Sequence, residues 1–167
     1  MNLTKNGLTI EVPDAVVVNL VLERLAGNSP VIAPPSQATP HLGEYWQGQG
    51  GIFVGTVLGI DGGRDYHLIL GPECDDELNH SDATQYAAGL EVDGHKDFTL
   101  PNRREQRFLF CNGHGHFKPR FYWSSEQLPA HPDYAFGQDF DDGGQSLTRE
   151  SYECPVRTVR RIYLTIR

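Results

Sequence analysis

The side chains best suited to metal chemistry are His114 and His116, which are separated by a single glycine. A strand or loop could aim both imidazoles at one ion, and imidazole nitrogens suit Zn, Ni or Cu. The neighbouring sequence supplies no second pair of ligands, and histidines among glycines are more typical of an exposed loop. We therefore predict no metal ligand and no cofactor. A metal-dependent enzyme acting on glycans through these two histidines stays as an alternative.

Glu105 is the carboxylate whose surroundings look most catalytic, but its position predicts a structural role. Proline is favoured at a helix start, so Pro101 predicts a helix that begins near Asn102. Glu105 can then bond back to the first turn, as in a capping box. The sequence contains no Ser–His–Asp arrangement, phosphate-binding loop or dinucleotide motif. We therefore predict no catalytic residue and a binding protein rather than an enzyme.

Arginines gather at two places in the sequence. Arg103, Arg104 and Arg107 lie together, and a second group follows near the C-terminus. Strand alternation predicts that Arg157 and Arg161 lie on one face and Arg160 on the other. Their expected partners are Asp97, Glu105 and the acidic cluster at 139–142, and a specific anion site is the alternative.

The composition limits the partners and the compartment. The 167 residues fit one domain with a short extra segment, and 14 Lys and Arg against 22 Asp and Glu give a net charge of −8. This acidic balance argues against nucleic acid as a partner. Cys74, Cys111 and Cys154 are expected to be three buried free thiols, as in a protein made in a reducing cytoplasm. The N-terminus lacks a secretory signal pattern, and the apolar run at 15–22 is too short to insert into a membrane.

Residues 1–40 are predicted to be a docking or oligomerisation segment that precedes a main domain over residues 41–167. A strand is expected over Leu8–Val12 and a proline-rich linker over Ser29–Pro40. Between them, Asp14–Ala26 favours a helix, although its three consecutive valines leave a strand as the alternative.

The main domain is predicted to be α+β, with two helices segregated from an antiparallel sheet. Its first two strands are expected to form a hairpin, and Ser81 or Asp82 is expected to cap the first helix. The expected elements are strands at 52–59 and 65–70, helices at 81–90 and from 101 onward, and strands at 121–124, 135–140 and 157–166.

Four segments of the main domain, taken in order, resemble the C-terminal domain of bacterial collagen-like adhesins, the Lcl C-terminal-domain family. Many members have Trp-Arg where this chain has Phe98-Thr99, and Thr where it has Asn102, and both departures fall in segments predicted to be structural. The resemblance extends from Glu44 to Arg161. Its matching segments are the alanine-rich 83–88, Gly94 with 97–105, the Tyr-Trp-Ser-Ser of 122–125 and the Val-Arg-Thr-Val-Arg of 156–160.

The resemblance implies a C-type-lectin-like fold and a non-enzymatic role. Members occur in surface adhesins and in proteins of tailed bacteriophages, and Tyr45–Phe53 looks most like the phage members. The implied function is that of a virion component, a tail-fibre or baseplate protein that is made in the host cytoplasm. Its expected partners are other phage tail proteins, a host cell-surface receptor or glycan, and further copies of the chain, with a trimer favoured. A cytoplasmic interaction protein, such as an assembly chaperone or a host-defence antagonist, is a further alternative.

Specificity is expected in the loops at 127–134 and 141–152, because recognition residues commonly lie on loops held by a rigid scaffold. Trp123 is predicted mainly to pack in the core, with sugar stacking as the alternative. Calcium-dependent glycan binding is not predicted, because the chain lacks the Glu-Pro-Asn or Gln-Pro-Asp and Trp-Asn-Asp triplets of sugar-binding C-type lectins. The predicted ligand-binding residues are Trp123, Glu126, Gln127, Tyr134, Asp141, Asp142, Gln145 and Tyr152.

Overall fold

The computed structural model describes residues 2–5, 8–11 and 38–165, and internal contacts divide the chain into two units between Ala38 and Thr39. In the first unit, β1 (Asn2–Lys5) pairs antiparallel with β2 (Leu8–Glu11). The strand predicted at this position is present as β2, whereas its partner β1 was not predicted. The helix expected over Asp14–Ala26, and most of the expected linker, lie outside the described residues.

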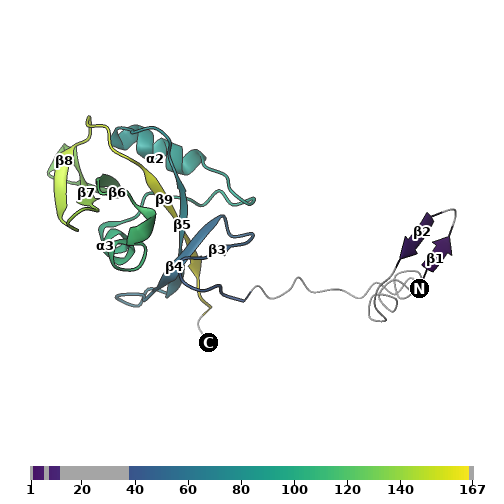
Figure 1. Ribbon diagram of the computed structural model, residues 1–167. Helices are drawn as coiled ribbons and strands as arrows, with labels where there is room; N and C mark the ends of the chain where they lie inside the picture. The colour runs from purple at the N-terminus through teal and green to yellow at the C-terminus, as the bar shows by residue number, and fades with distance from the viewer. Residues whose placement is uncertain (1, 6–7, 12–37, 166–167) are drawn as a thin grey trace. The chain divides into compact units, whose positions relative to one another are not determined.

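The second unit is α+β, with two antiparallel sheets and two helices (Figure 1), so the predicted class is confirmed. One sheet has the order β3-β4-β5-β9, and the other has the order β6-β7-β8. Helix α3 contacts strands of both sheets, whereas α2 contacts β6. The strands are β3 (Tyr45–Trp46), β4 (Gly51–Val57), β5 (Tyr66–Glu73), β6 (Phe121–Leu128), β7 (His131–Asp139), β8 (Gln145–Arg149) and β9 (Arg157–Tyr163), and the helices are α2 (His80–Gly89) and α3 (Arg103–Asn112).

The predicted hairpin is confirmed as β4 and β5, but the prediction of irregular loops at 127–134 and 141–152 is wrong for most of the first segment and for 145–149 of the second. Most of 127–134 belongs to β6 and β7, which are joined by a turn at 129–130, and 145–149 is the edge strand β8. The side chains of β8 are mostly polar and exposed or half-buried, so its sequence lacks the alternation that marks a strand. Backbone pairing with β7 determines this structure, and such pairing cannot be seen from local composition.

Both helices have side-chain caps at their N-termini. The cap of α2 is Asn79, whose side chain accepts a hydrogen bond from the Asp82 backbone, so the prediction of Ser81 or Asp82 as the cap is wrong. The capping box predicted for α3 is confirmed. The Asn102 side chain accepts from the Glu105 N–H at 2.8 Å, and the Glu105 carboxylate accepts from the Asn102 N–H at 2.9 Å.

The core of the second unit has two main apolar clusters and a third, small one of Trp46, Phe53 and Ile69. Of the two main clusters, the larger lies between the four-stranded sheet and α3, and the smaller joins α2 to the other sheet. Trp123 belongs to the smaller cluster: its side chain is 1% exposed, and its indole N–H donates to the Leu78 carbonyl at 2.8 Å. The predicted core role of Trp123 is therefore confirmed, and its assignment as a ligand-binding residue is wrong. The larger cluster contains Val54, Val57, Tyr66, Leu68, Leu70, Leu109, Tyr122, Phe140 and Val159, and the smaller contains Ala83, Ala87, Leu100, Trp123, Ala135, Cys154 and Val156.

A buried ion pair connects α3 to the four-stranded sheet. Glu105 is fully buried, and Arg161 donates to both of its carboxylate oxygens, at 2.6 and 2.7 Å. The Tyr66 hydroxyl donates to the same carboxylate at 2.8 Å. Burial, together with the nearby carboxylate, raises the pKa of Tyr66 to about 12, so this hydroxyl keeps its proton and stays a donor.

The other terminal arginines also lie as strand alternation predicted. Arg160, on the opposite face of β9, donates to Asp97 at 2.6 Å. The partner of Arg157 is Glu73, at 3.5 Å, and not the acidic cluster at 139–142. The register explains this choice, because Glu73 pairs directly with Arg157 across β5 and β9.

Glu105→Gln is expected to lower the free energy of unfolding by about 3 kcal/mol, because it leaves Arg161 without its buried counter-charge. Urea denaturation followed by circular dichroism measures the change. Glu153→Gln, at an exposed position, is the matched control and should change stability by less than about 0.5 kcal/mol. Equal midpoints for the two variants would contradict a stabilising role for the ion pair.

Candidate functional site

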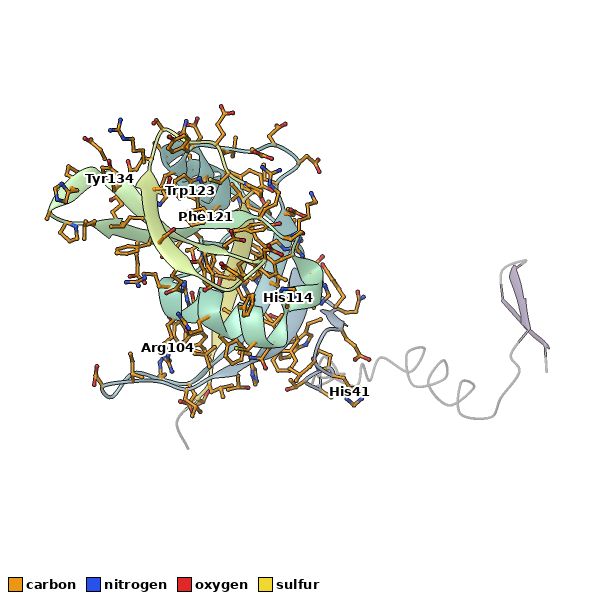
Figure 2. All side chains as sticks on the ribbon, turned by 60° about the vertical axis from the view of Figure 1, so that its left-hand side comes forward. His41, Arg104, His114, Phe121, Trp123 and Tyr134 are labelled. Carbon is orange, nitrogen blue, oxygen red and sulfur yellow. The ribbon has the colours of Figure 1, made fainter. Side chains whose placement is uncertain are left out.

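The residues predicted to bind a ligand do not form one site. Trp123 is in the core, whereas Tyr134 lies on β7 and its hydroxyl accepts from Arg149 at 3.2 Å. Gln127 donates to Glu150, and Tyr152 is 60% exposed on a separate turn. Figure 2 shows Tyr134 at the outer part of the domain, in a different region from Arg104 at the start of α3. The predicted set therefore combines residues from several surfaces.

Asp141 and Asp142 form the turn between β7 and β8. The backbone N–H of Asp141 donates to the Asp139 carboxylate at 2.9 Å, and the Gly144 N–H donates to the Asp142 carboxylate at 2.7 Å. The carboxylates of this acidic cluster therefore stabilise the turn by accepting hydrogen bonds from its backbone.

Glu126 and Gln145, in contrast, both hold the first residue of α3. The Glu126 carboxylate accepts from the Arg103 backbone N–H at 2.9 Å. The Gln145 side chain donates to the Arg103 carbonyl at 2.6 Å and to Gln138 at 2.8 Å. Gln145 also lines a pocket that begins at this point and contains three arginines, whereas Glu126 lines an adjoining pocket that shares Arg104 with it.

This arginine pocket, of about 610 Å³, lies between α3 and the end of β4. Its volume is in the range of small-molecule sites. Gly55, whose φ is +128°, lets β4 approach the helix closely, because a Cβ there would lie 2.8 Å from the Phe108 ring. The lining has three guanidinium groups, an apolar wall and no carboxylate. It consists of Thr56, Val57, Leu58, Arg103, Arg104, Arg107, Phe108, Cys111, Asn112 and Gln145.

The helical period brings the three arginines of the pocket together. Arg107 follows Arg103 by four residues and Arg104 by three, and residues at these spacings are neighbours on a helix surface. Glu105, Gln106 and Leu109 point the other way and are fully buried. The same helix therefore anchors in the core through one face and presents positive charge through the other.

These three guanidinium groups have no carboxylate partner among the described residues. Arg103 stacks over the Phe136 ring at 4.0 Å, and its Nε is buried without a hydrogen-bond partner. Arg104 donates to the Leu58 carbonyl at 2.8 Å, and the Arg107 side chain makes no hydrogen bond or ion pair with any other residue that the structure describes.

Four other described arginines, in contrast, each pair with an acidic residue: Arg120 with Glu77, Arg157 with Glu73, Arg160 with Asp97 and Arg161 with Glu105. The arginine pocket is therefore a place of unneutralised positive charge in an acidic protein. The clustering of its arginines was visible in the sequence, but their common orientation needed the helix position.

His114 and His116 form a single 3-10 turn after α3. The Nε2 atom of His114 lies 2.8 Å from the Phe140 carbonyl oxygen, and its ring packs edge-on against Phe110. Within residues 38–165, and in the two short strands, no group of three or more His, Cys, Asp or Glu side chains is placed to hold a metal ion. The structure therefore adds no further ligand to this histidine pair.

The three cysteines are free, as predicted, but they differ in exposure. Cys154 is buried, Cys74 is half-buried, and Cys111 is exposed at the arginine pocket. The prediction of three buried thiols is therefore wrong for Cys111, which lies near the surface end of α3. Burial raises the pKa of the Cys154 thiol to about 11.

Neutral iodoacetamide at pH 8 is expected to modify Cys111 first and Cys154 last in the native protein, with all three thiols modified in denaturant. The unfolded pKa of cysteine is about 8.5. Because the unfolded chain ionises the Cys154 thiol more easily than the folded protein does, the free energy of unfolding is highest below this pH and falls as the pH rises toward 11. Peptide mass spectrometry and unfolding at pH 8 to 10.5 test this, with Cys154→Ala as the control. Rapid native modification of Cys154 would contradict it.

No helix in the part of the chain that the structure describes is long and apolar enough to cross a membrane. No protein-family model matches the chain, and no curated protein matches it. The chemistry of the arginine pocket is therefore the basis for the functional interpretation.

Proposed function

We propose that this chain is a non-enzymatic component of a tailed-phage virion, a tail-fibre or baseplate protein whose residues 41–167 form a C-type-lectin-like domain for attachment to the host surface. The observation that carries the proposal is the arginine pocket, which offers charge, hydrogen-bond donors and an apolar wall on a rigid scaffold. Such a lining suits ligand recognition, because a few placed polar groups fix orientation while apolar groups supply contact area.

The segments that resemble the adhesin family support the C-type-lectin-like part of this proposal. Leu100 and Trp123 are buried, and Arg157 and Arg160 each pair with a carboxylate from another element, Glu73 and Asp97. The matched residues thus have scaffold positions, in agreement with a family whose shared pattern fixes a fold. Of the residues that line the arginine pocket, only Arg103 and Arg104 belong to the matched segments, while Arg107, Cys111 and Gln145 lie outside them.

Residues 1–40 supply the docking and oligomerisation function in this proposal, with a trimer as the favoured state. Several copies would raise the overall affinity of weak single contacts for a host surface. The β1–β2 hairpin supplies backbone hydrogen-bonding groups that could pair with another chain. Other tail proteins and further copies of this chain are the expected partners.

Fluorescently labelled full-length protein is expected to adhere to host cells, and Arg107→Glu should weaken adhesion by about tenfold because it introduces a negative charge into the arginine pocket. Lys96→Glu makes the same change in net charge at an exposed position outside the pocket lining and should leave adhesion unchanged. Flow cytometry measures bound protein. Mass spectrometry of purified virions should detect the chain, and its absence there would instead favour a cytoplasmic interaction protein.

Deletion of residues 1–40 is expected to convert the trimer to monomers, since the second unit has its own core and should fold alone. Multi-angle light scattering gives the masses of both forms. A trimer that persists after the deletion would place the oligomer contacts in residues 41–167.

A further inference from the structure

We propose that the arginine pocket binds an acidic sugar unit, with a carboxylate or phosphate oxyanion held by Arg103, Arg104 and Arg107 and the sugar ring against Val57, Leu58 and Phe108. This inference rests on the proposed attachment function and names its ligand class. The first argument is charge: the lining contains three guanidinium groups and no carboxylate, and these groups have no acidic partner among the described residues.

The geometry of Arg103 favours a planar oxyanion over a diffuse counter-ion. Stacking over Phe136 at 4.0 Å fixes the plane of the guanidinium, and the hydrogen bonds from Gln145 and to Glu126 fix the backbone beneath it. Its buried Nε lacks an acceptor. A guanidinium held in this way loses little freedom when it bonds a carboxylate or phosphate in the bidentate manner.

The apolar wall argues for a ring rather than a free inorganic ion. Leu58 is 64% exposed and Phe108 is half-buried, so both retain surface that a ligand can cover. The apolar face of a sugar ring is suited to this contact, while its hydroxyls can bond to the neutral polar residues of the lining, Thr56, Asn112 and Gln145. The volume of about 610 Å³ accommodates such a unit.

Glu126 is the nearby carboxylate that could oppose this assignment, but it lines an adjoining pocket instead. That neighbour also contains Arg104, together with Arg64 and Arg161. Arg104 thus lies between two openings. In the second opening Arg161 is already paired with Glu105, so Arg64 is the further guanidinium without an acidic partner among the described residues. Arg64 could contact a second acidic unit of a polysaccharide whose first unit occupies the arginine pocket.

Cys111 provides a built-in probe, because it is exposed and lines the arginine pocket. The full-length protein is treated with two methanethiosulfonates of similar size, one bearing a sulfonate and one a trimethylammonium group. Each rate is divided by the rate of the same reagent with free 2-mercaptoethanol, and Cys111→Ser identifies the reacting thiol. The normalised rate should be about tenfold higher for the anionic reagent, because positive potential concentrates anions.

Arg107→Glu should remove this anion preference, whereas Lys96→Glu should keep it. Equal normalised rates in the native protein would overturn the inference, and so would a preference that both variants retain. Circular dichroism shows that each variant is folded, which separates loss of charge from loss of structure.

The ligand class is tested by protection of Cys111 from neutral iodoacetamide at constant ionic strength. Glucuronate and glucose 6-phosphate should slow the reaction at least threefold at saturation, and glucose should not, since it has the same ring without the charge. Protection by only one of the two acidic sugars supports the inference and identifies the oxyanion. Protection by polyglutamate alone, or by none of the probes, overturns it.

Failure of this inference can be distinguished from failure of the proposed function. If the protein adheres to host cells but Cys111 shows no anion preference, the attachment role is supported and the acidic ligand is rejected. If acidic sugars protect Cys111 but the protein neither adheres to cells nor occurs in virions, the acidic ligand is supported and the attachment role is rejected.

Discussion

The buried pair of Glu105 and Arg161 is the interaction on which the domain depends. It links the first turn of α3 to the last strand of the four-stranded sheet with two charge-assisted hydrogen bonds of 2.6 and 2.7 Å. A carboxylate that is fully buried is costly unless all its oxygens are bonded, and Tyr66 and the Asn102 N–H complete that requirement. These bonds thus fix both the position of α3 along its axis and its rotation about that axis.

The orientation of α3 determines the surface of the domain as well as its core. Once Glu105, Gln106 and Leu109 face inward, Arg103, Arg104 and Arg107 must lie on the remaining sides of the same two turns. The end of β4 then closes the arginine pocket from the opposite side, where Gly55 permits a close approach to Phe108. The recognition surface we propose is consequently a by-product of the contact that stabilises the fold.

The second sheet supports this surface from beneath. Phe136 and Gln138 of β7 and Gln145 of β8 contact Arg103 or one another, so the start of α3 is bonded to strands far away in sequence. Gln138 also donates to the Gln106 carbonyl at 3.2 Å from a fully buried position. A binding group that is fixed by several neighbours needs less reordering when the ligand arrives, which favours affinity at a given contact area.

The sequence alone determined the elements whose cause is local. Pro101, Asn102 and Glu105 define a helix start within five residues, the β4–β5 hairpin follows from two apolar runs around a glycine turn, and alternation placed the faces of Arg157, Arg160 and Arg161. These predictions succeeded because the interactions that decide them lie within one turn of helix or along one strand.

Only the tertiary structure decided which side chains meet. Most of 127–134 and all of 145–149, which were expected to be loops, are paired strands. Trp123 is buried, and Gln145 bonds to Arg103, which lies 42 positions away in the sequence. Strand pairing and pocket closure depend on contacts between distant segments, which no local pattern specifies. The arginine cluster was visible in the sequence, but its exposure, its lack of carboxylate partners and the apolar wall opposite it exist only in the folded domain.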